Sequence, residues 1–454
     1  MSIKSMASTY CPPFLRPAFD RIDNSPIGSR LTRGVFWSMA GAVISRGLML
    51  AASVLVARML GKTGFGELGM IRSTVGMFGV FAGFGLGLTA TKHVAEFRTS
   101  DPNRAGRIIG LSGLFAMVTG GLMALGLFIF APWLAAHTIN APHLATVLRI
   151  GTLILFINAL NGAQTGALAG FEAFKTIAYV NLFVGLISFP ILVCGTYFGG
   201  LTGAVWALAI NLGFNWLLNH LALRKEARRH RVPFTFKQCS RELSVLWKFS
   251  LPALLGGVLV WPARWACNAM LVNRPEGYDE MGIFNAADQW YAIMLFLPGL
   301  LGSVILPVTS EQFSRKNTKQ LMKIVRLAIK INVLFVLPLV LLASIVSPYI
   351  MSLYGDGFTK GWPTLIVALL TAGIIAGQMP VGQIITASGK MWIGFAMRSC
   401  WALTFIVATL ILLDFGSLGL ATARAVSYVV YTILTLGFVI RIVRKKSCLS
   451  VNKI

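Results

Sequence analysis

Charged residues are scarce in this sequence, and acidic ones are scarcest: Asp, Glu, Lys and Arg make up 12% of the chain, with 15 acidic residues against 40 basic. The six cysteines form no C-x-x-C pair or other metal-ligand spacing, and the five histidines are scattered. No nucleophile–base pair, glycine-rich phosphate loop or signal-peptide pattern is visible. The sequence therefore predicts no disulfide framework, no metal site and no catalytic residues.

Apolar residues are abundant, at 56% of the chain, and the mean hydropathy is +0.74. A soluble core cannot hide that much apolar surface, so we predict an all-α polytopic membrane protein. Runs of about 20 apolar residues predict twelve transmembrane helices. They are 34–58, 66–90, 108–132, 147–170, 177–198, 201–223, 250–272, 282–306, 325–347, 362–386, 391–413 and 418–441.

The net charge of +25 lies between the apolar runs rather than on one basic face, which argues against a nucleic-acid partner. With both termini in the cytoplasm, the inside segments hold 30 of the 40 Lys and Arg residues and the outside segments hold four. The predicted organisation is a cytoplasmic tail over 1–33, a first lobe of six helices over 34–223, a basic cytoplasmic linker over 224–249, a second lobe of six helices over 250–441 and a cytoplasmic tail over 442–454.

The two lobes resemble each other weakly. Segment 65–68 matches 281–284, segment 169–170 matches 388–389, and segment 198–201 matches 415–418, at separations of 216, 219 and 217 residues. A nearly constant separation indicates an internal repeat. Because each copy has an even number of spans, both enter the membrane in the same direction, and we expect two pseudo-symmetric lobes around a central cavity.

Arginines interrupt several of these apolar runs. A guanidinium stays protonated, and its burial at the centre of a membrane helix costs about 2.5 to 3.5 kcal/mol on the mildest scale, so several of them predict a water-filled cavity that receives an anion. Arginine presents fork-shaped donors that suit phosphate oxygens. The candidate pyrophosphate-binding residues are Arg46, Arg72, Arg264, Arg149 and Arg424.

Asp288 is the only deep acidic residue. From the helical rise of 1.5 Å per residue, it lies in about the same layer of the membrane as Arg46, Arg72 and Arg264. The separation of 216 residues also makes it the repeat equivalent of Arg72, so we expect the two to form a gating ion pair across the lobes or to couple transport to an ion. Snorkelling of the arginines, or a buried pair with Asp288, are the structural alternatives.

Two stripes of amides follow the fourth and sixth predicted spans. They are Asn158, Asn161 and Gln164 at every third residue, and Asn211, Asn215 and Asn219 at every fourth. Such stripes can hydrogen-bond sugar hydroxyls, or they can join neighbouring helices without any ligand.

The run from Ala57 to Leu68, the glycine-rich segment Gly83 to Leu88 and the basic segment Lys92 to Arg98 resemble the first hairpin of the bacterial O-antigen and exopolysaccharide flippases of the multidrug/oligosaccharidyl-lipid/polysaccharide (MOP) superfamily. The resemblance covers about residues 30 to 445. It implies a V-shaped cavity between two six-helix lobes in the bacterial inner membrane, whose cationic residues receive a polyprenyl-pyrophosphate-linked oligosaccharide for alternating-access transport. Membrane lipids, a polysaccharide polymerase and chain-length machinery are the further partners that it implies.

Two rival functions are open at this stage. A multidrug (MATE-like) exporter would share the fold, but its cationic drugs call for acidic cavity residues, which the first lobe lacks except for Glu67 at the edge of a span. A membrane polysaccharide polymerase or ligase would need a large outer loop with catalytic residues, and every outer loop here is short. We expect no cofactor; a proton gradient, a sodium gradient or the membrane potential are the candidate driving forces.

Overall fold

The computed structural model describes the backbone over residues 26–233, 239–245, 250, 258–302, 305, 309, 318–387 and 391–451. Every element in these ranges is a helix, which confirms the all-α prediction. In chain order they are α3 (Pro26–Gly83), α4 (Leu86–Phe97), α5 (Pro102–Trp133), the π-helical turn η1 (Leu134–Thr138), η2 (Pro142–Leu144), α6 (Ala145–Gly170), α7 (Phe174–Arg229), η3 (Cys239–Glu242), α8 (Leu243–Val245), α10 (Val260–Val272), α11 (Gly277–Met294), α13 (Thr318–Ile345), α14 (Ser347–Ser352), η5 (Asp356–Gly361), α15 (Trp362–Ala387), α16 (Met391–Leu412), η6 (Leu413–Phe415) and α17 (Gly416–Val451).

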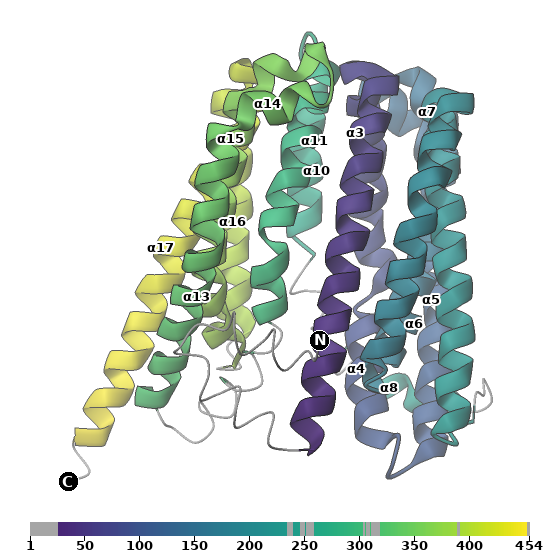
Figure 1. Ribbon diagram of the computed structural model, residues 1–454, viewed down its shortest axis with the longest axis vertical. Helices are drawn as coiled ribbons and strands as arrows, with labels where there is room; N and C mark the ends of the chain where they lie inside the picture. Colours follow the sequence, from purple (N-terminus) through teal and green to yellow (C-terminus); the bar gives the residue numbers. More distant parts are fainter. Residues whose placement is uncertain are drawn as a thin grey trace, which may run out of the picture.

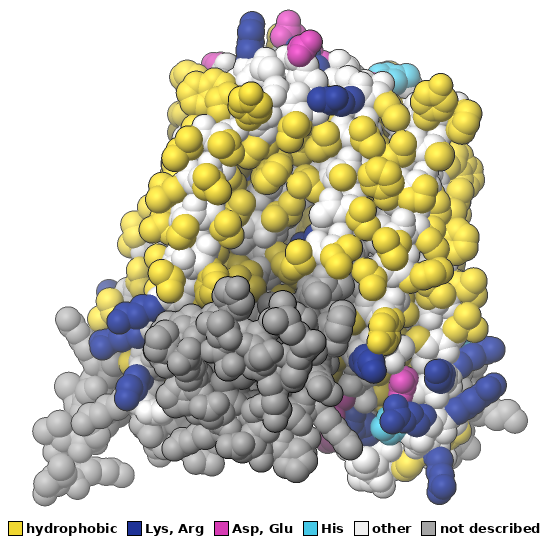
Figure 2. Space-filling model, viewed as in Figure 1, with side chains coloured by type: hydrophobic (Ala, Val, Ile, Leu, Met, Phe, Trp, Pro, Cys, Tyr) yellow, Lys and Arg dark blue, Asp and Glu magenta, His cyan; other side chains and the backbone are white. Residues whose placement is uncertain are grey.

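The helices form two groups that stand side by side (Figure 1). Helices α3 to α7 make the first lobe, and helices α10 to α17 make the second lobe. The lobes meet at the upper end of the view, where α11 lies beside α3, and they diverge toward the lower end, where α17 finishes. Figure 2 shows that apolar side chains cover the middle of the molecule and that basic side chains gather mainly at the lower end. This is the surface of a protein that spans a bilayer.

Seven described stretches are long and apolar enough to cross a membrane. Three of them are 50 to 56 residues long, which exceeds the 20 or so residues that one crossing needs. Each contains a glycine with a positive φ at the junction of two predicted spans, namely Gly61 (68°), Gly200 (55°) and Gly416 (59°). Glycine lacks a Cβ and adopts this conformation without steric cost, so the chain can reverse there. The count of twelve spans stays a prediction.

Several helices run past the predicted spans. Helix α3 begins at Pro26 rather than residue 34, α7 continues to Arg229 rather than ending at residue 223, and α17 continues to Val451 rather than ending at residue 441. Hydropathy marks only the segment that suits hydrocarbon, whereas Arg, Lys and Glu are good helix formers that extend a helix into water. The predicted tails and linker are therefore partly helical.

Two predicted spans are interrupted in the structure. In the second span, α3 ends at Gly83 and α4 begins at Leu86, because Phe84 and Gly85 both have positive φ values of 42° and 67°. In the eighth span, α11 ends at Met294, four residues before Pro298. A proline removes one backbone hydrogen bond and its ring crowds the carbonyl four residues earlier, which accounts for this break.

Buried apolar side chains show where the lobes are joined. One large cluster combines residues of both lobes, and in it the Phe65 ring lies 6.1 Å from that of Phe358 and 6.2 Å from that of Tyr354. Toward the lower end each lobe has a separate cluster, around Val94 in the first and around Val325 in the second. Among the described residues, the lobes thus share one apolar cluster toward the upper end and have separate clusters toward the lower end, where Thr89 and Ser250 are joined by a hydrogen bond of 2.6 Å.

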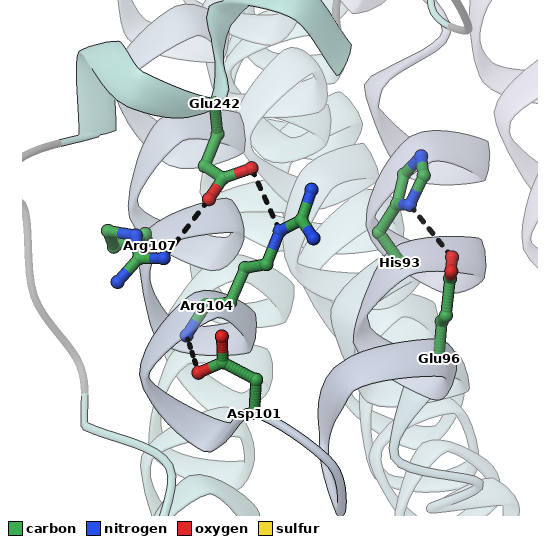
Figure 3. A network of polar contacts seen from close by, with 6 residues as sticks. All are labelled: His93, Glu96, Asp101, Arg104, Arg107 and Glu242. Carbon is green, nitrogen blue, oxygen red and sulfur yellow. Dashed lines mark hydrogen bonds and ion pairs between the residues drawn. The ribbon is translucent and has the colours of Figure 1, made fainter.

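The segment after α7 is anchored to the first lobe through a buried carboxylate (Figure 3). Glu242, which is 5% exposed, accepts hydrogen bonds from Arg104 Nε at 3.1 Å and from Arg107 Nη2 at 3.2 Å. Asp101 caps the same helix, α5, by accepting from the backbone N–H of Arg104 at 2.9 Å. The described part of the connection, residues 239–245, is therefore held against the first lobe.

Candidate anion site between the lobes

A cluster of three charged residues lies inside the second lobe. Asp288 on α11 receives hydrogen bonds from Arg264 on α10, at 3.1 Å and 3.4 Å, and from Nη1 of Arg424 on α17. We call these residues the charge cluster. The side chains of Arg264 and Asp288 keep 28% and 27% exposure even though both residues lie within helices of the bundle. Both side chains are therefore partly accessible, as binding of a ligand requires.

Arg424 requires a correction to the predicted ligand set. Its side chain is 2% exposed, and its guanidinium lies 4.9 Å from the ring of Phe284 and 4.2 Å from the ring of Tyr291. These rings and Asp288 stabilise the buried cation through cation–π and ionic contacts. Arg424 is thus enclosed in this structure and is not open to a ligand.

Asp288 is not paired with Arg72 in this structure, because both of its guanidinium partners come from its own lobe. Arg72 forms no hydrogen bond or ion pair with any residue that the structure describes, and it is partly exposed. The expected gating pair between Asp288 and Arg72 is therefore not formed in this conformation. A permanent positive charge without a counter-ion among apolar helices would be stabilised by binding an anion.

Arg72 lies at the interface with α10, close to the region of the charge cluster. Its neighbour Ser73 accepts a hydrogen bond from Asn268 Nδ2 at 2.9 Å, and Thr74 accepts one from Trp265 Nε1 at 3.0 Å. These contacts directly follow Arg72 on α3 and Arg264 on α10, and they hold the two arginine-bearing helices together.

Arg46 faces the second lobe from the other arm of α3. Its guanidinium carbon lies 4.1 Å from the centre of the Phe296 ring, and its side chain is exposed. Seven residues along, Ser53 accepts a hydrogen bond from Gln289 Nε2 at 2.6 Å. Both contacts join the same two antiparallel segments, so Arg46 lies on the arm that faces the segment carrying Asp288.

Arg149 is placed apart from these residues. It is exposed near the start of α6, with its guanidinium 5.1 Å from the ring of Phe128, which is itself 47% exposed. None of its described contacts involves the other four candidate arginines. The structure therefore brings together Arg264 and Arg424 directly and leaves Arg149 outside the group.

Most of the amide stripes serve contacts between or within helices. Asn161 donates to the Leu212 carbonyl at 3.2 Å, Asn219 donates to Asn215 at 2.8 Å, and Asn211 donates to Ser188 at 2.7 Å. Asn161, Asn211 and Asn219 are 5%, 7% and 3% exposed, so sugars have no access to them in this structure. Gln164 lies 3.4 Å from a ring nitrogen of His220, and Asn158 is exposed. The helix-joining alternative accounts for the three buried members.

A second arrangement, missed from the sequence, closes the upper end between the lobes. Asp279 at the start of α11 forms an ion pair with Lys62 at 2.7 Å and accepts a hydrogen bond from Thr63. Below them Gly66 packs against Gly282 so closely that a Cβ on Gly66 would lie 1.9 Å from the Tyr278 carbonyl oxygen. We call these contacts the upper contact. Small residues allow such close approach of two membrane helices.

The repeat separation could have predicted the upper contact. Thr63 and Asp279 are 216 residues apart, and so are Gly66 and Gly282, which means that equivalent positions of the two copies touch near their pseudo-symmetry axis. Burial pushes the pKa of Asp279 upward, but the hydrogen bonds from Lys62 and Thr63 outweigh that effect and hold it below the ordinary value of 3.8. The ion pair is therefore kept at neutral pH.

Comparisons with known proteins agree with this architecture. A family model described as "Polysaccharide biosynthesis protein" matches residues 31–313. The EPS I polysaccharide export inner membrane protein EpsE of Ralstonia nicotianae is 25% identical over 85% of this chain and 89% of its own length. The lipid III flippase of Escherichia coli is 24% identical over 90% of this chain and 97% of its own length. A solved inward-facing multidrug resistance MATE family transporter of the MOP superfamily superposes with a TM-score of 0.75 at 16% identity, over 91% of this chain and 98% of that one.

Proposed function

The chain belongs to the polysaccharide biosynthesis protein family, and on that premise we propose that it is an inner-membrane flippase. Its substrate is a polyprenyl-pyrophosphate-linked oligosaccharide, which it moves from the cytoplasmic to the outer leaflet for O-antigen, capsule or exopolysaccharide synthesis. Relatives named as a polysaccharide export protein and a lipid III flippase support a transporter rather than a polymerase or ligase. The observation that supports the proposal is Arg72, which has no ion pair among the residues that the structure describes and whose neighbours Ser73 and Thr74 contact α10, the helix of Arg264.

The polarity of the site favours an anionic substrate over the cationic drugs of a multidrug exporter. Arg46 contacts Phe296 of the second lobe, Arg264 is partly accessible, and Arg72 has no ion pair among the described residues, while Asp288 offsets only one charge of the cluster that it forms with Arg264 and Arg424. In the first lobe, Glu67 at the edge of its span lies 2.6 Å from a ring nitrogen of His143. A pyrophosphate matches this excess of positive charge, whereas a cation would be repelled.

The mechanism is alternating access. We take the lower end, which carries most of the basic side chains in Figure 2, as the cytoplasmic side by the positive-inside rule. The proposed orientation has both termini in the cytoplasm. The upper contact then closes the outer side, and the headgroup enters from below while the lipid tail stays in the bilayer. Rocking of the lobes about the site breaks the upper contact and releases the substrate outward.

Direction requires a driving force. The candidate sources are a proton gradient, a sodium gradient and the membrane potential, and Asp288 is our candidate for coupling transport to an ion. Outside the membrane the product is taken up by a polysaccharide polymerase and its chain-length machinery. Membrane lipids are the remaining partner.

The experiment is translocation of a labelled polyprenyl-pyrophosphate oligosaccharide in reconstituted vesicles, with wild type, Arg46→Ala and Arg46→Lys. We expect Arg46→Ala to lose most transport and Arg46→Lys to keep part of it, because a lysine retains the charge but not the fork-shaped donors. Arg274→Ala is the matched control, since Arg274 is 48% exposed and pairs with Asp414 at the upper end, away from the site. Transport of a lipophilic cation instead of the oligosaccharide would refute the proposal.

A further inference from the structure

The two arginines bound to Asp288 differ in how firmly they are held. Arg424 is 2% exposed and is fixed by Asp288 and by two aromatic rings. Arg264 is 28% exposed, lies 3.1 Å from Asp288 at its nearest, and is 5.7 Å from the ring of Trp261. The guanidinium of Arg264 is therefore partly accessible to a ligand, and that of Arg424 is enclosed.

Because of how the charges are balanced, releasing Arg264 from Asp288 costs little free energy. Removing one partner of a buried ion pair is strongly unfavourable when it leaves a lone charge behind. If Arg264 turns away, Asp288 is still neutralised by Arg424, and Arg264 keeps access to water or a ligand through its exposed side. If Arg424 left instead, it would lose its carboxylate, although its Nε and Nη2 atoms already have no hydrogen-bond partner among the described residues.

We propose that Asp288 is the resident counter-ion of Arg264 and that the substrate pyrophosphate takes its place. This inference rests on the proposed function and gives Asp288 a defined part in it. In the empty transporter the carboxylate holds Arg264. When the headgroup enters, the guanidinium exchanges the carboxylate oxygens for phosphate oxygens, while Arg424 stays on Asp288. No covalent bond changes.

The exchange has a consequence for affinity. Because the carboxylate and the phosphate compete for one guanidinium, Asp288 weakens binding of the substrate and speeds its release on the outer side. Asp288 thus sets the affinity of the site without contacting the substrate. If it served only to position Arg264, its removal would weaken binding instead, and this difference in sign separates the two roles.

The test measures binding of inorganic pyrophosphate and of polyprenyl pyrophosphate to the full-length protein in detergent by calorimetry, for wild type, Asp288→Asn and Asp288→Glu. We expect Asp288→Asn to bind both probes about five- to tenfold more tightly, which corresponds to about 1 to 1.4 kcal/mol, and to transport more slowly in vesicles. Asp288→Glu should stay near wild type because it retains the competing charge. Glu276→Gln is the matched control, an exposed acid at the start of the same helix.

A second variant keeps the test decisive if the single one does not fold. Asp288→Asn combined with Arg424→Met removes the buried cation together with its carboxylate, and the same tightening is expected from it. Adding Arg264→Ala should abolish that gain. Unchanged or weaker binding in either folded variant would overturn the role of Asp288 while leaving the flippase intact. Failure of the wild type to bind or move any pyrophosphate lipid would instead overturn the proposed function itself.

Discussion

The tight backbone contact of Gly66 with α11 offers a sharp test of how the structure opens. Substituting Gly66 by alanine places a Cβ 1.9 Å from the Tyr278 carbonyl oxygen and 2.9 Å from the backbone nitrogen of Gly282. Both obstacles are backbone atoms, so no side chain can move aside. Since ordinary contacts need about 3.5 Å, the helices must separate by roughly 1.5 Å at this point.

The effect of Gly66→Ala on the equilibrium is the difference between its effects on the conformation with a closed upper contact and on the outward-open one. Alanine stabilises the helix by about 1 kcal/mol relative to glycine, but it does so whether the lobes are closed or open, and this gain cancels. Overpacking affects only the closed upper contact, at about 1 to 3 kcal/mol. The equilibrium should therefore shift toward the outward-open state by about 5- to 150-fold.

The assay is a distance measurement between spin labels at Tyr197 in the first lobe and Tyr349 in the second, both highly exposed, in a background without native cysteines. Gly66→Ala should broaden and lengthen the distance distribution. Gly79→Ala on the same arm of α3 is the control, because its Cβ meets only Leu155 at an ordinary 3.8 Å. An unchanged distribution in the folded Gly66→Ala protein would refute the reasoning, and so would an equal change in the control.

Two further predictions concern the ion pairs outside the membrane. Glu242→Gln should weaken the attachment of the linker to Arg104 and Arg107 by about 1 to 2 kcal/mol, a value kept small because Arg104 is 39% exposed. Tryptic cleavage between residues 224 and 249 should then become about 5- to 30-fold faster. An unaltered cleavage rate would contradict this anchoring. The pKa of Asp279 is lowered in the folded protein, so its contribution to the upper contact is present above its ordinary value of 3.8 and lost as the pH falls through the lower folded value. The same spin-label distance should hence stay constant from pH 8 to pH 5, and a clear change within that range would show that another group controls the contact.

Much of the fold follows from short-range physics that the sequence carries. Apolar runs of about 20 residues place the membrane helices, because hydrocarbon selects length and hydropathy. Gly61, Gly200 and Gly416 lie at junctions between predicted spans, because only glycine adopts those φ values freely. The repeat separation of 216 residues also marked Gly66 and Gly282 as equivalent, although their direct contact could be seen only in three dimensions.

The sequence did not predict which charged residues pair with one another. Depth along a helix placed Arg46, Arg72, Arg264 and Asp288 in one layer, but depth does not give the direction in which a side chain points. The structure pairs Asp288 with Arg264 and Arg424, and it leaves Arg72 without an ion pair among the described residues.

The sequence by itself determined that this chain is helical, spans a membrane and carries permanent positive charge deep within it, because composition and periodicity act residue by residue. Only the tertiary structure decided which cations are already neutralised and which are open to a ligand. Whether an arginine is neutralised or accessible depends on the rotation of each helix about its axis and on the packing between the lobes, and no local sequence pattern gives either. Arg424 and Arg264 look alike in the sequence, and burial alone separates the enclosed one from the partly accessible one.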